Sequence, residues 1–280
     1  MTRLVLIYNT NHKTITVETF GGRKAIILKP SLNHQTLRPA YFQIDLNVNI
    51  GYVLLMLSNA ASYINQMLTT IAIFTVQVNT NMTKEEILEL VLSLGSNHLE
   101  VFGGRFVGGK KIQQVPEEIS EVIYTLLQLK PEIKNYAEIG SAGGGTTALL
   151  DEIFKLENAF IVDDNLHDDH KERPEILKDV KNVYEFIGDS QGAEAKKFVE
   201  SFNIPLDMLF IDADHSYNGV KNDTFNYIGL VKSGGFIMYH DTVSYPGVKQ
   251  HVEEMQQDSE NYKLIINTGS KCGLALFQKL

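Results

Sequence analysis

The stretch "YAEIGSAGGGTTALL", Tyr136 to Leu150, carries the strongest indication of the fold. It has the pattern of a β-strand, followed by four glycines in six residues, followed by a helix. Glycine lets the backbone approach a ligand closely, and the first turn of a helix presents free amide groups. The pattern is therefore typical of a site for a nucleotide-like ligand, although a tight loop without a ligand also fits. The turn alone does not identify the ligand.

The sequence after this turn continues as an alternation of strands and helices. The strand-like runs are "NYAEIG", "AFIVD", "VYEFIGD", "LDMLFIDA" and "GGFIMYHD", with helix-like runs between them. Apolar strands that alternate with helices predict a parallel sheet covered on both faces. The C-terminus differs, because "YKLIIN" and "GLALFQ" flank a turn at Thr268–Ser270. This hairpin predicts an antiparallel last strand.

Composition limits the classes of partner. The chain has 280 residues, a net charge of -9 and no block of Lys and Arg. Nucleic-acid binding draws most of its affinity from neutralised phosphates, so we expect small molecules or proteins as partners and no nucleic acid. The single cysteine, Cys272, cannot form an internal disulfide. Together with the lack of a secretory h-region near Met1, this indicates a reducing compartment, and we expect a cytoplasmic protein.

Residues 1–80 differ from the rest and are expected to form a β-rich N-terminal domain. Its β-type runs are "RLVLIY", "TITVET", "KAIIL", "FQIDLNVNI" and "IAIFTVQV". The uncharged run "GYVLLMLSNAASYINQMLTTIAIF" is long enough to span a bilayer, but its polar residues share one helical face opposite Leu57 and Ile64. We therefore expect an amphipathic helix and no membrane span. It would pack on the domain's own sheet or on a second subunit, which favours a homo-oligomer.

Residues 81–115 are expected to connect this domain to a larger one at 116–280. Thr83 and Glu86 have the spacing of a capping box, which predicts a helix that begins at Thr83. The Gly-rich run that follows is either a linker or an active-site flap. Pro116 is a favoured first-turn residue, and Pro131 ends the helix that it opens.

Ligands of open parallel sheets bind beyond the carboxyl ends of the strands, so the residues there are candidates. The first strand ends at Glu138 and Gly140, before the glycine turn. The second ends at Asp163, about twenty residues beyond the turn, where a carboxylate can accept both hydroxyls of a ribose. The third ends at Asp189 and Ser190, where a carboxylate can accept a hydrogen bond from an adenine amine.

The next two strands end in "IDADHSY" and "YHDT". If these strands are neighbours, Asp212, His240 and Asp241 converge at one edge, where they could hold a divalent cation. His215 is placed to accept a proton from a group bound beside them. The alternative is structural: Asp214 caps a helix and His240 is a hydrogen-bonded residue at the edge of the core. The acidic run "DDNLHDDH" at 163–170 also resembles a metal cluster, but a solvated loop explains it better.

These motifs together resemble those of class I S-adenosylmethionine-dependent methyltransferases. "EIGSAGGGTT" is similar to their acidic-x-Gly-x-Gly-x-Gly motif, with Ala142 at the middle glycine. "IDADHSYNGVKND", "LVKSGGFIMYHD" and "KIQQVPEEI" resemble the small-molecule O-methyltransferase branch that includes the macrocin and mycinamicin sugar methyltransferases. The resemblance implies a Rossmann-like seven-stranded sheet with an antiparallel last strand, and S-adenosylmethionine as cofactor.

The resemblance also implies roles for individual residues. The cofactor-binding positions are Glu138, Gly140, Ser141, Gly144, Asp163, Asp189, Ser190 and Asp212. It implies a cation at Asp212, His240 and Asp241, and His215 with Asp212 as the catalytic pair. Relatives often have an acid at the position of His240, whereas imidazole suits transition metals better than magnesium. The expected cation is therefore either magnesium or a transition metal.

The sequence therefore predicts an O-methyltransferase for a small hydroxylated substrate, such as a sugar or a sugar-bearing metabolite. One alternative is a nicotinamide-dependent oxidoreductase, against which the terminal hairpin and the "IDADHSY" and "HDT" motifs argue. The other is a non-catalytic binding protein with a methyltransferase fold. Such a protein could lose the acids at the strand ends, whereas this chain keeps them.

Overall fold

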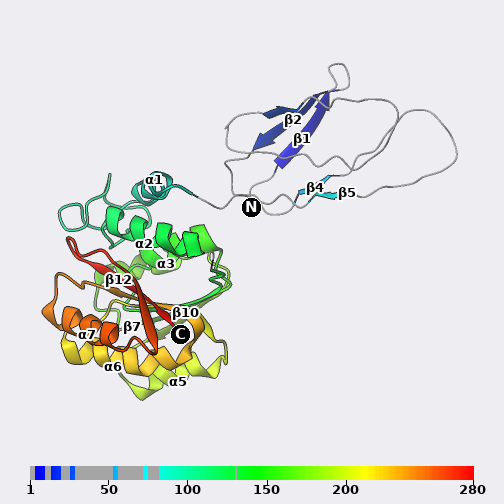
Figure 1. The fold of residues 1–280 in the computed structure, drawn as a ribbon. Helices are drawn as coiled ribbons and strands as arrows, with labels where there is room; N and C mark the ends of the chain where they lie inside the picture. Colours follow the sequence, from blue (N-terminus) through cyan, green and yellow to red (C-terminus); the bar gives the residue numbers. More distant parts are fainter. Residues whose placement is uncertain are drawn as a thin grey trace. The chain divides into compact units, whose positions relative to one another are not determined.

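The computed structural model describes residues 82–129 and 131–280, together with the backbone of five short strands in the first 80 residues. The chain folds into two compact units, 1–80 and 81–280. Figure 1 shows the elements of both.

The first unit contains two small antiparallel sheets. One consists of β1 (Leu4–Asn9), β2 (Thr14–Thr19) and β3 (Ile26–Leu28), and the other of β4 (Val53–Leu55) and β5 (Ala72–Phe74). Three of the β-type runs are therefore strands, and a fourth contains β5. The predicted helix is wrong for 53–55, because these residues pair with β5.

The other predictions for this unit lie outside the described residues. They include the remainder of the amphipathic helix, the strand at 42–50 and the burial of Leu57 and Ile64 in a subunit interface. In the part of the chain that the structure describes, no helix has the length and apolar character needed to cross a membrane.

The second unit is built on a seven-stranded sheet in the order β11-β12-β10-β9-β6-β7-β8. β12 runs antiparallel to both neighbours, and the other pairs are parallel. The predicted sheet with its antiparallel last strand is confirmed. The strands are β6 (Asn135–Ile139), β7 (Asn158–Asp163), β8 (Val183–Ile187), β9 (Leu206–Ile211), β10 (Val231–His240), β11 (Tyr262–Asn267) and β12 (Leu274–Lys279).

Helices cover both faces of this sheet (Figure 1). One face is covered by α1 (Lys84–Leu94), α2 (Pro116–Leu129) and α3 (Gly145–Phe154). The other is covered by α5 (Ala193–Ser201), α6 (Tyr217–Tyr227) and α7 (Pro246–Gln257). Three short helical segments, η1 (Asp168–Glu172), α4 (Arg173–Ile176) and η2 (Ile228–Leu230), complete the unit.

The helix starts follow local rules. Thr83 caps α1, because its hydroxyl accepts the Glu86 amide while the Glu86 carboxylate accepts the Thr83 amide. The predicted capping box is thus confirmed, as are the bounds of the helix that begins at Pro116.

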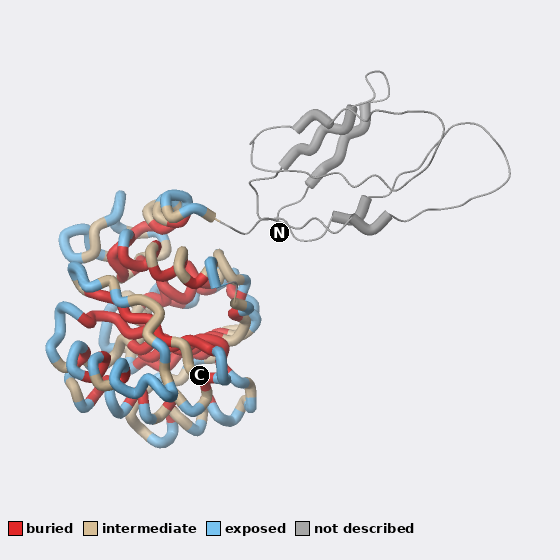
Figure 2. The backbone as a smooth tube through the Cα atoms, viewed as in Figure 1, coloured by how far each residue is buried: buried red, intermediate tan, exposed pale blue. Residues whose placement is uncertain are grey.

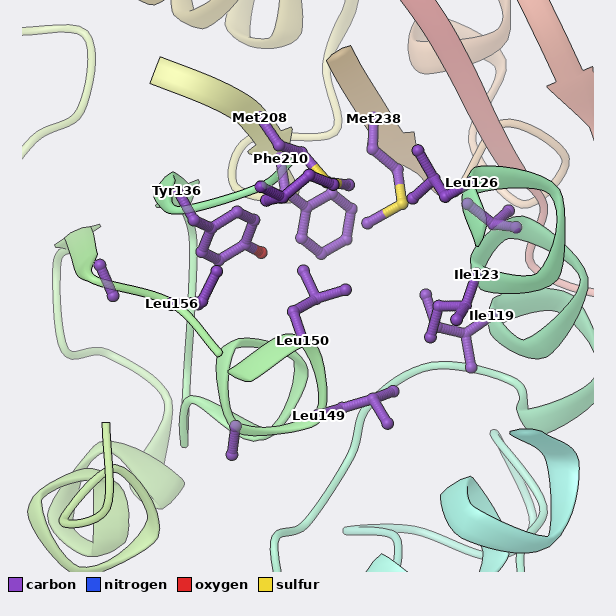
Figure 3. Close-up of a cluster of buried hydrophobic side chains, with 14 of the residues drawn as sticks. Ile119, Ile123, Leu126, Tyr136, Leu149, Leu150, Leu156, Met208, Phe210 and Met238 are labelled. Atoms are coloured by element: carbon purple, nitrogen blue, oxygen red, sulfur yellow. The ribbon is translucent and has the colours of Figure 1, made fainter. Parts of the chain in front are cut away.

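The strands supply a separate core to each helix layer. In β9, Met208 and Phe210 point toward α2 and α3, whereas Leu209 and Ile211 point to the opposite face. This alternation follows from the period of two residues along a strand. Figure 2 shows the buried sheet between more exposed helices. Figure 3 shows side chains of α2 and α3 closing over Met208, Phe210 and Met238.

The order of the strands in the sheet indicates where a ligand site lies. β6 lies between β9 and β7, so the order of the strands reverses beside β6. In open α/β sheets the ligand crevice lies at such a reversal, beyond the carboxyl ends of the strands. The glycine turn after β6 and the "IDADHSY" run after β9 are therefore neighbours across this edge.

Candidate active site

A cavity of about 1200 Å³ opens at the carboxyl edge of the sheet. Its volume exceeds the roughly 300–1,000 Å³ of a typical small-molecule pocket, so it has room for more than one ligand. The lining comes from the ends of β6 to β10 and from further segments that contain Phe102, Gln114, Tyr245 and Cys272. All the residues predicted for the site line this cavity except Gly144, which lies at the start of α3.

The glycine turn requires glycine at its first position. Gly140 has a φ of 80°, in the left-handed region that other residues rarely adopt. A Cβ atom there would lie 2.2 Å from the carbonyl oxygen of Asp212. The turn and the end of β9 therefore touch backbone to backbone. At the other end of the turn, Gly145 and Thr146 present the N-terminus of α3 to the cavity.

Glu138 lies on the α3 side of β6 and is buried, and the Thr147 hydroxyl donates a hydrogen bond to its carboxylate. Burial away from water raises the pKa of Glu138 to about 8, an effect that the nearby Asp212 carboxylate increases. Glu138 therefore carries a proton near neutral pH.

Asp163 occupies the predicted position at the end of β7, but its carboxylate serves the turn itself. Oδ2 accepts the amides of Ser141 at 2.7 Å and Ala142 at 2.8 Å. Oδ1 accepts the Asn165 amide at 2.7 Å and lies 3.0 Å from Nη2 of the buried Arg173. Asp163 is 7 % exposed. Both oxygens of Asp163 thus contact protein groups, with three hydrogen bonds from backbone amides and an ion pair to Arg173, whose Nη2 makes no hydrogen bond among the described residues.

After β8, the Asp189 side chain is exposed, whereas the Ser190 side chain is hydrogen-bonded within the protein. Asp189 is exposed, and its Oδ1 accepts the Gln191 amide at 2.9 Å. The Ser190 hydroxyl instead donates to the buried Asp223 at 2.7 Å, and the Tyr227 hydroxyl donates to the Ser190 carbonyl. Burial raises the pKa of Asp223 to about 7. The Ser190 side chain therefore anchors its loop to α6.

Two carboxylates and two imidazoles meet at the ends of β9 and β10. His240 Nδ1 lies 3.1 Å from Asp212 Oδ1 and 3.4 Å from Asp241 Oδ2. His215 Nε2 lies 3.4 Å and 3.1 Å from the same two oxygens. Asp241 has a φ of 61°, which is uncommon outside glycine and places its carboxylate in this group. We refer to these four residues as the acid–imidazole cluster.

Charge attraction dominates the titration of this cluster. Burial opposes the ionisation of Asp212, but attraction to His240 and hydrogen bonds from both imidazoles outweigh it and lower the pKa of Asp212 to about 2. For the imidazoles, burial likewise opposes the charged form. Hydrogen bonding and attraction to Asp212 outweigh it, raising the pKa of His215 and raising that of His240 well above its usual value.

The donor set suits a divalent cation. Donor atoms of Asp212, His215 and Asp241 all lie within 4.8 Å of one another, and so do those of His240, Asp241 and Cys272. The buried Nε2 of His240 has no hydrogen-bond partner among the described residues. Carboxylates alone would suit magnesium, whereas the imidazoles and a nearby thiol shift the preference toward a transition metal.

Tyr245 covers one face of the His215 ring. The two rings stack, with centroids 4.3 Å apart and an angle of 20° between the planes. The side chain is 30% exposed, so the ring is held in place without being fully buried. The structural alternative is wrong for Asp214, because Ser216 is the N-cap of α6 and Asp214 only accepts the Ser216 amide. His240 is buried and hydrogen-bonded to Asp212, as that alternative also expects.

Sequence reasoning missed Gln114. Its amide donates to Asp212 Oδ2 at 3.1 Å, and the residue is 1% exposed. Because Gln114 belongs to the Gly-rich run after α1, that run forms part of the cavity wall. The "DDNLHDDH" run is also more than a solvated loop, since Asp169 accepts hydrogen bonds from Asn97, Lys111 and Gln113 of the wall. No motif marks either connection.

Comparison with known proteins agrees with this geometry. Residues 137–242 match a family model described as a methyltransferase domain. A curated relative, an uncharacterized protein of Acanthamoeba polyphaga mimivirus, is 30% identical over 138 residues. The match covers 43% of this chain and 60% of the relative, so the chain spans less than two thirds of that relative's length.

Two solved structures illustrate the similarity in fold, and the first of them shares it over most of its length. A Staphylococcus aureus protein assigned as a caffeoyl-CoA O-methyltransferase has a TM-score of 0.51 and 18% identity, covering 70% of this chain and 99% of that one. MycE methyltransferase of the mycinamycin biosynthetic pathway, solved with Mg and SAH, has a TM-score of 0.42 and 15% identity, covering 60% of this chain and 50% of its own. Residues 137–242 are thus similar to a methyltransferase domain, and the Staphylococcus aureus structure shares the seven-stranded fold.

Proposed function

We propose that this chain is an S-adenosylmethionine-dependent O-methyltransferase that acts on a small hydroxylated acceptor. One observation carries the proposal: a single cavity joins the glycine turn after β6 to the acid–imidazole cluster after β9 and β10. The turn supplies a site for the cofactor, and the cluster supplies groups that can activate a hydroxyl beside it. The methyltransferase-domain match over this segment supports the assignment.

The cofactor would lie across the carboxyl edge of the sheet. The methionine end is proposed to lie near Glu138, Gly140 and Ser141, beside the N-terminus of α3. The adenine is proposed to lie near Asp189, whose carboxylate is exposed on the cavity. S-adenosylmethionine supplies a methyl group on a sulfonium, and the protein's part is to align it with the acceptor oxygen.

The cluster would remove the proton of the acceptor hydroxyl. We assign the His215 imidazole as the proton acceptor. Asp212 and Asp241 hold the ring through its Nε2–H, so that Nδ1 is the basic nitrogen of the neutral ring, and Tyr245 holds the face of the ring. Gln114 fixes the second oxygen of Asp212. A divalent cation at Asp212, His240 and Asp241 would lower the pKa of the hydroxyl.

The acceptor that we propose is a sugar or a sugar-bearing metabolite. This choice rests on the likeness of the "IDADHSY" and "YHDT" runs to those of sugar O-methyltransferases. The outer cavity wall also carries Val101, Phe102, Leu166 and Tyr245, so the acceptor must present an apolar face along with its hydroxyls.

Calorimetry and a transfer assay test the proposal. We expect S-adenosylhomocysteine to bind the wild-type chain and to raise its melting temperature, and we expect NAD to do neither. With labelled S-adenosylmethionine and a panel of glycosides, Asp212→Asn should lose most methyl transfer but keep S-adenosylhomocysteine binding. Glu253→Gln, an exposed substitution on α7, is the control. Binding of NAD in place of S-adenosylhomocysteine would rule the function out.

A further inference from the structure

Cys272, the single cysteine of the chain, lines the cavity next to the acid–imidazole cluster. Donor atoms of Cys272, His240 and Asp241 all lie within 4.8 Å of one another. Asp212, His215 and Asp241 form a second group of the same kind, so the two groups share Asp241. The thiol therefore adds a sulfur donor to the carboxylates and imidazoles of the cluster.

Backbone contacts hold Cys272 at this place. Its carbonyl accepts the amide of Val243 at 2.9 Å and that of Ser244 at 3.2 Å, both in the turn that follows β10. The next residue, Gly273, has a φ of 87°, and a Cβ atom there would clash with the Thr242 hydroxyl. The turn before β12 and the turn after β10 are thus packed closely together, so the position of Cys272 is fixed by the fold.

The His240 ring gives a second, independent indication of a ligand. The side chain is 4% exposed, and its Nδ1 lies 3.1 Å from Asp212 Oδ1. In the part of the chain that the structure describes, the buried Nε2 has no hydrogen-bond partner. Metal-binding histidines commonly donate one ring nitrogen to a carboxylate and bind the metal through the other. His240 has this arrangement, which leaves one nitrogen for a metal.

The types of donor atom decide the class of metal. Magnesium takes oxygen ligands, whereas thiolates and imidazoles favour transition metals. Zinc in particular is bound by thiolate, imidazole and carboxylate groups in tetrahedral sites. Three protein ligands leave one position of such a site open, which a hydroxyl of the acceptor could take.

We propose that Cys272 binds the cation together with His240 and Asp241, and that this cation is zinc or a similar transition metal instead of magnesium. The thiol and any protonated imidazole release their protons to solvent on binding, because a metal binds the thiolate and the neutral ring. His215 is not one of these three ligands and keeps its assignment as proton acceptor. The inference rests on the proposed function for the role of the cation, whereas the metal site is tested without methyl transfer.

Cobalt(II) reports the thiol directly, because a thiolate ligand gives bound cobalt a strong near-ultraviolet absorption band. The untagged wild-type chain, Cys272→Ser and the control Ser244→Ala are titrated with cobalt chloride without oxygen. Ser244 is exposed on the neighbouring turn, and its substitution keeps the backbone amide. Since the chain has one cysteine, a thiolate band can come only from Cys272. We expect the band in the wild type and the control, and its loss in Cys272→Ser.

Competition identifies the class of metal. Zinc should displace the cobalt, and an excess of magnesium should not. In Cys272→Ser, zinc affinity should fall by at least about 10- to 100-fold, because the loss of an outer partner of a ligand already costs that much. A further measurement needs no substitution: zinc should slow the alkylation of Cys272 by iodoacetamide in the wild-type chain, and magnesium should not.

The outcomes separate this inference from the proposed function. Cobalt that binds without the thiolate band, or alkylation that zinc does not slow, would overturn the inference and leave the proposed function intact. A thiolate band that forms with the same cobalt affinity in His240→Gln would overturn it as well, because the thiol would then bind metal outside the proposed site. Zinc binding through Cys272 in a chain that binds no S-adenosylhomocysteine would support the inference and overturn the proposed function.

Discussion

Replacement of Gly140 with Ala tests whether the contact between the glycine turn and β9 builds the site. A Cβ atom at Gly140 would lie 2.2 Å from the Asp212 carbonyl oxygen, a backbone atom that no rotamer change can move. The left-handed conformation costs alanine about 1–2 kcal/mol, and overpacking of this kind costs typically about 1–3 kcal/mol. We therefore expect a loss of roughly 2–5 kcal/mol.

For a unit of this size, each kcal/mol lowers the melting temperature by about 2–4 °C, so Gly140→Ala should melt roughly 4–20 °C lower. Circular dichroism measures the shift. The matched control is Gly229→Ala in η2, where an added Cβ meets nothing within 4 Å, and it should stay within about 0.5 kcal/mol of the wild type. Equal melting temperatures for the two variants would refute the reasoning, because the close contact would then have no energetic consequence.

Two further predictions concern titration. The methyl-transfer rate should rise with pH, with a midpoint above the usual histidine value of about 6.5, because a general base must be neutral and the pKa of His215 is raised; His215→Ala should flatten this profile and lower the rate about 10²–10⁴-fold. Glu138 has a pKa of about 8 when folded, so native Glu138 keeps a proton that the unfolded chain releases near pH 4.5. The free energy of unfolding should therefore fall as the pH rises from about 4.5 to about 8, and melting curves of Glu138→Gln should show a smaller fall. The same pH slope in the variant and the wild type would count against a neutral buried Glu138.

The sequence predicts the sheet well because its signals are local. Runs such as "LDMLFI" are buried on both faces, and the hairpin of β11 and β12 indicates the antiparallel strand. The positions of Asp212, His240 and Asp241 follow from the same signal, since parallel strands end at one edge. Short apolar runs carry less information: Val53–Leu55 fits a helix or a strand by periodicity, and pairing with β5 decides between them.

The parts of the site that the sequence does not predict depend on contacts between distant segments. Gln114 reaches Asp212 across 98 positions, and Arg173 reaches Ala142 across 31. Gln114 lies in the "KIQQVPEEI" run, but nothing in that run points to Asp212, and Arg173 belongs to no quoted motif, so only the folded chain shows their contacts. The role of Asp163 is hidden for a related reason. Its partners are largely backbone amides, which every sequence contains, and their orientation depends on the turn.

Hydrogen-bond saturation separates the structural acids of this fold from those available to a ligand. Asp207 is 6% exposed, and its carboxylate accepts the amides of Lys134 and Asn135 at 2.7 Å each while pairing with Lys232. It fixes the start of β6 as Asp163 fixes the turn after its end, and protein groups contact both oxygens of each carboxylate. Asp164 and Asp189 each accept a local backbone amide with one oxygen, and both residues line the cavity. Because a buried carboxylate must be satisfied by protein whereas an exposed one need not be, burial and bond count together identify the acids that can bind a ligand.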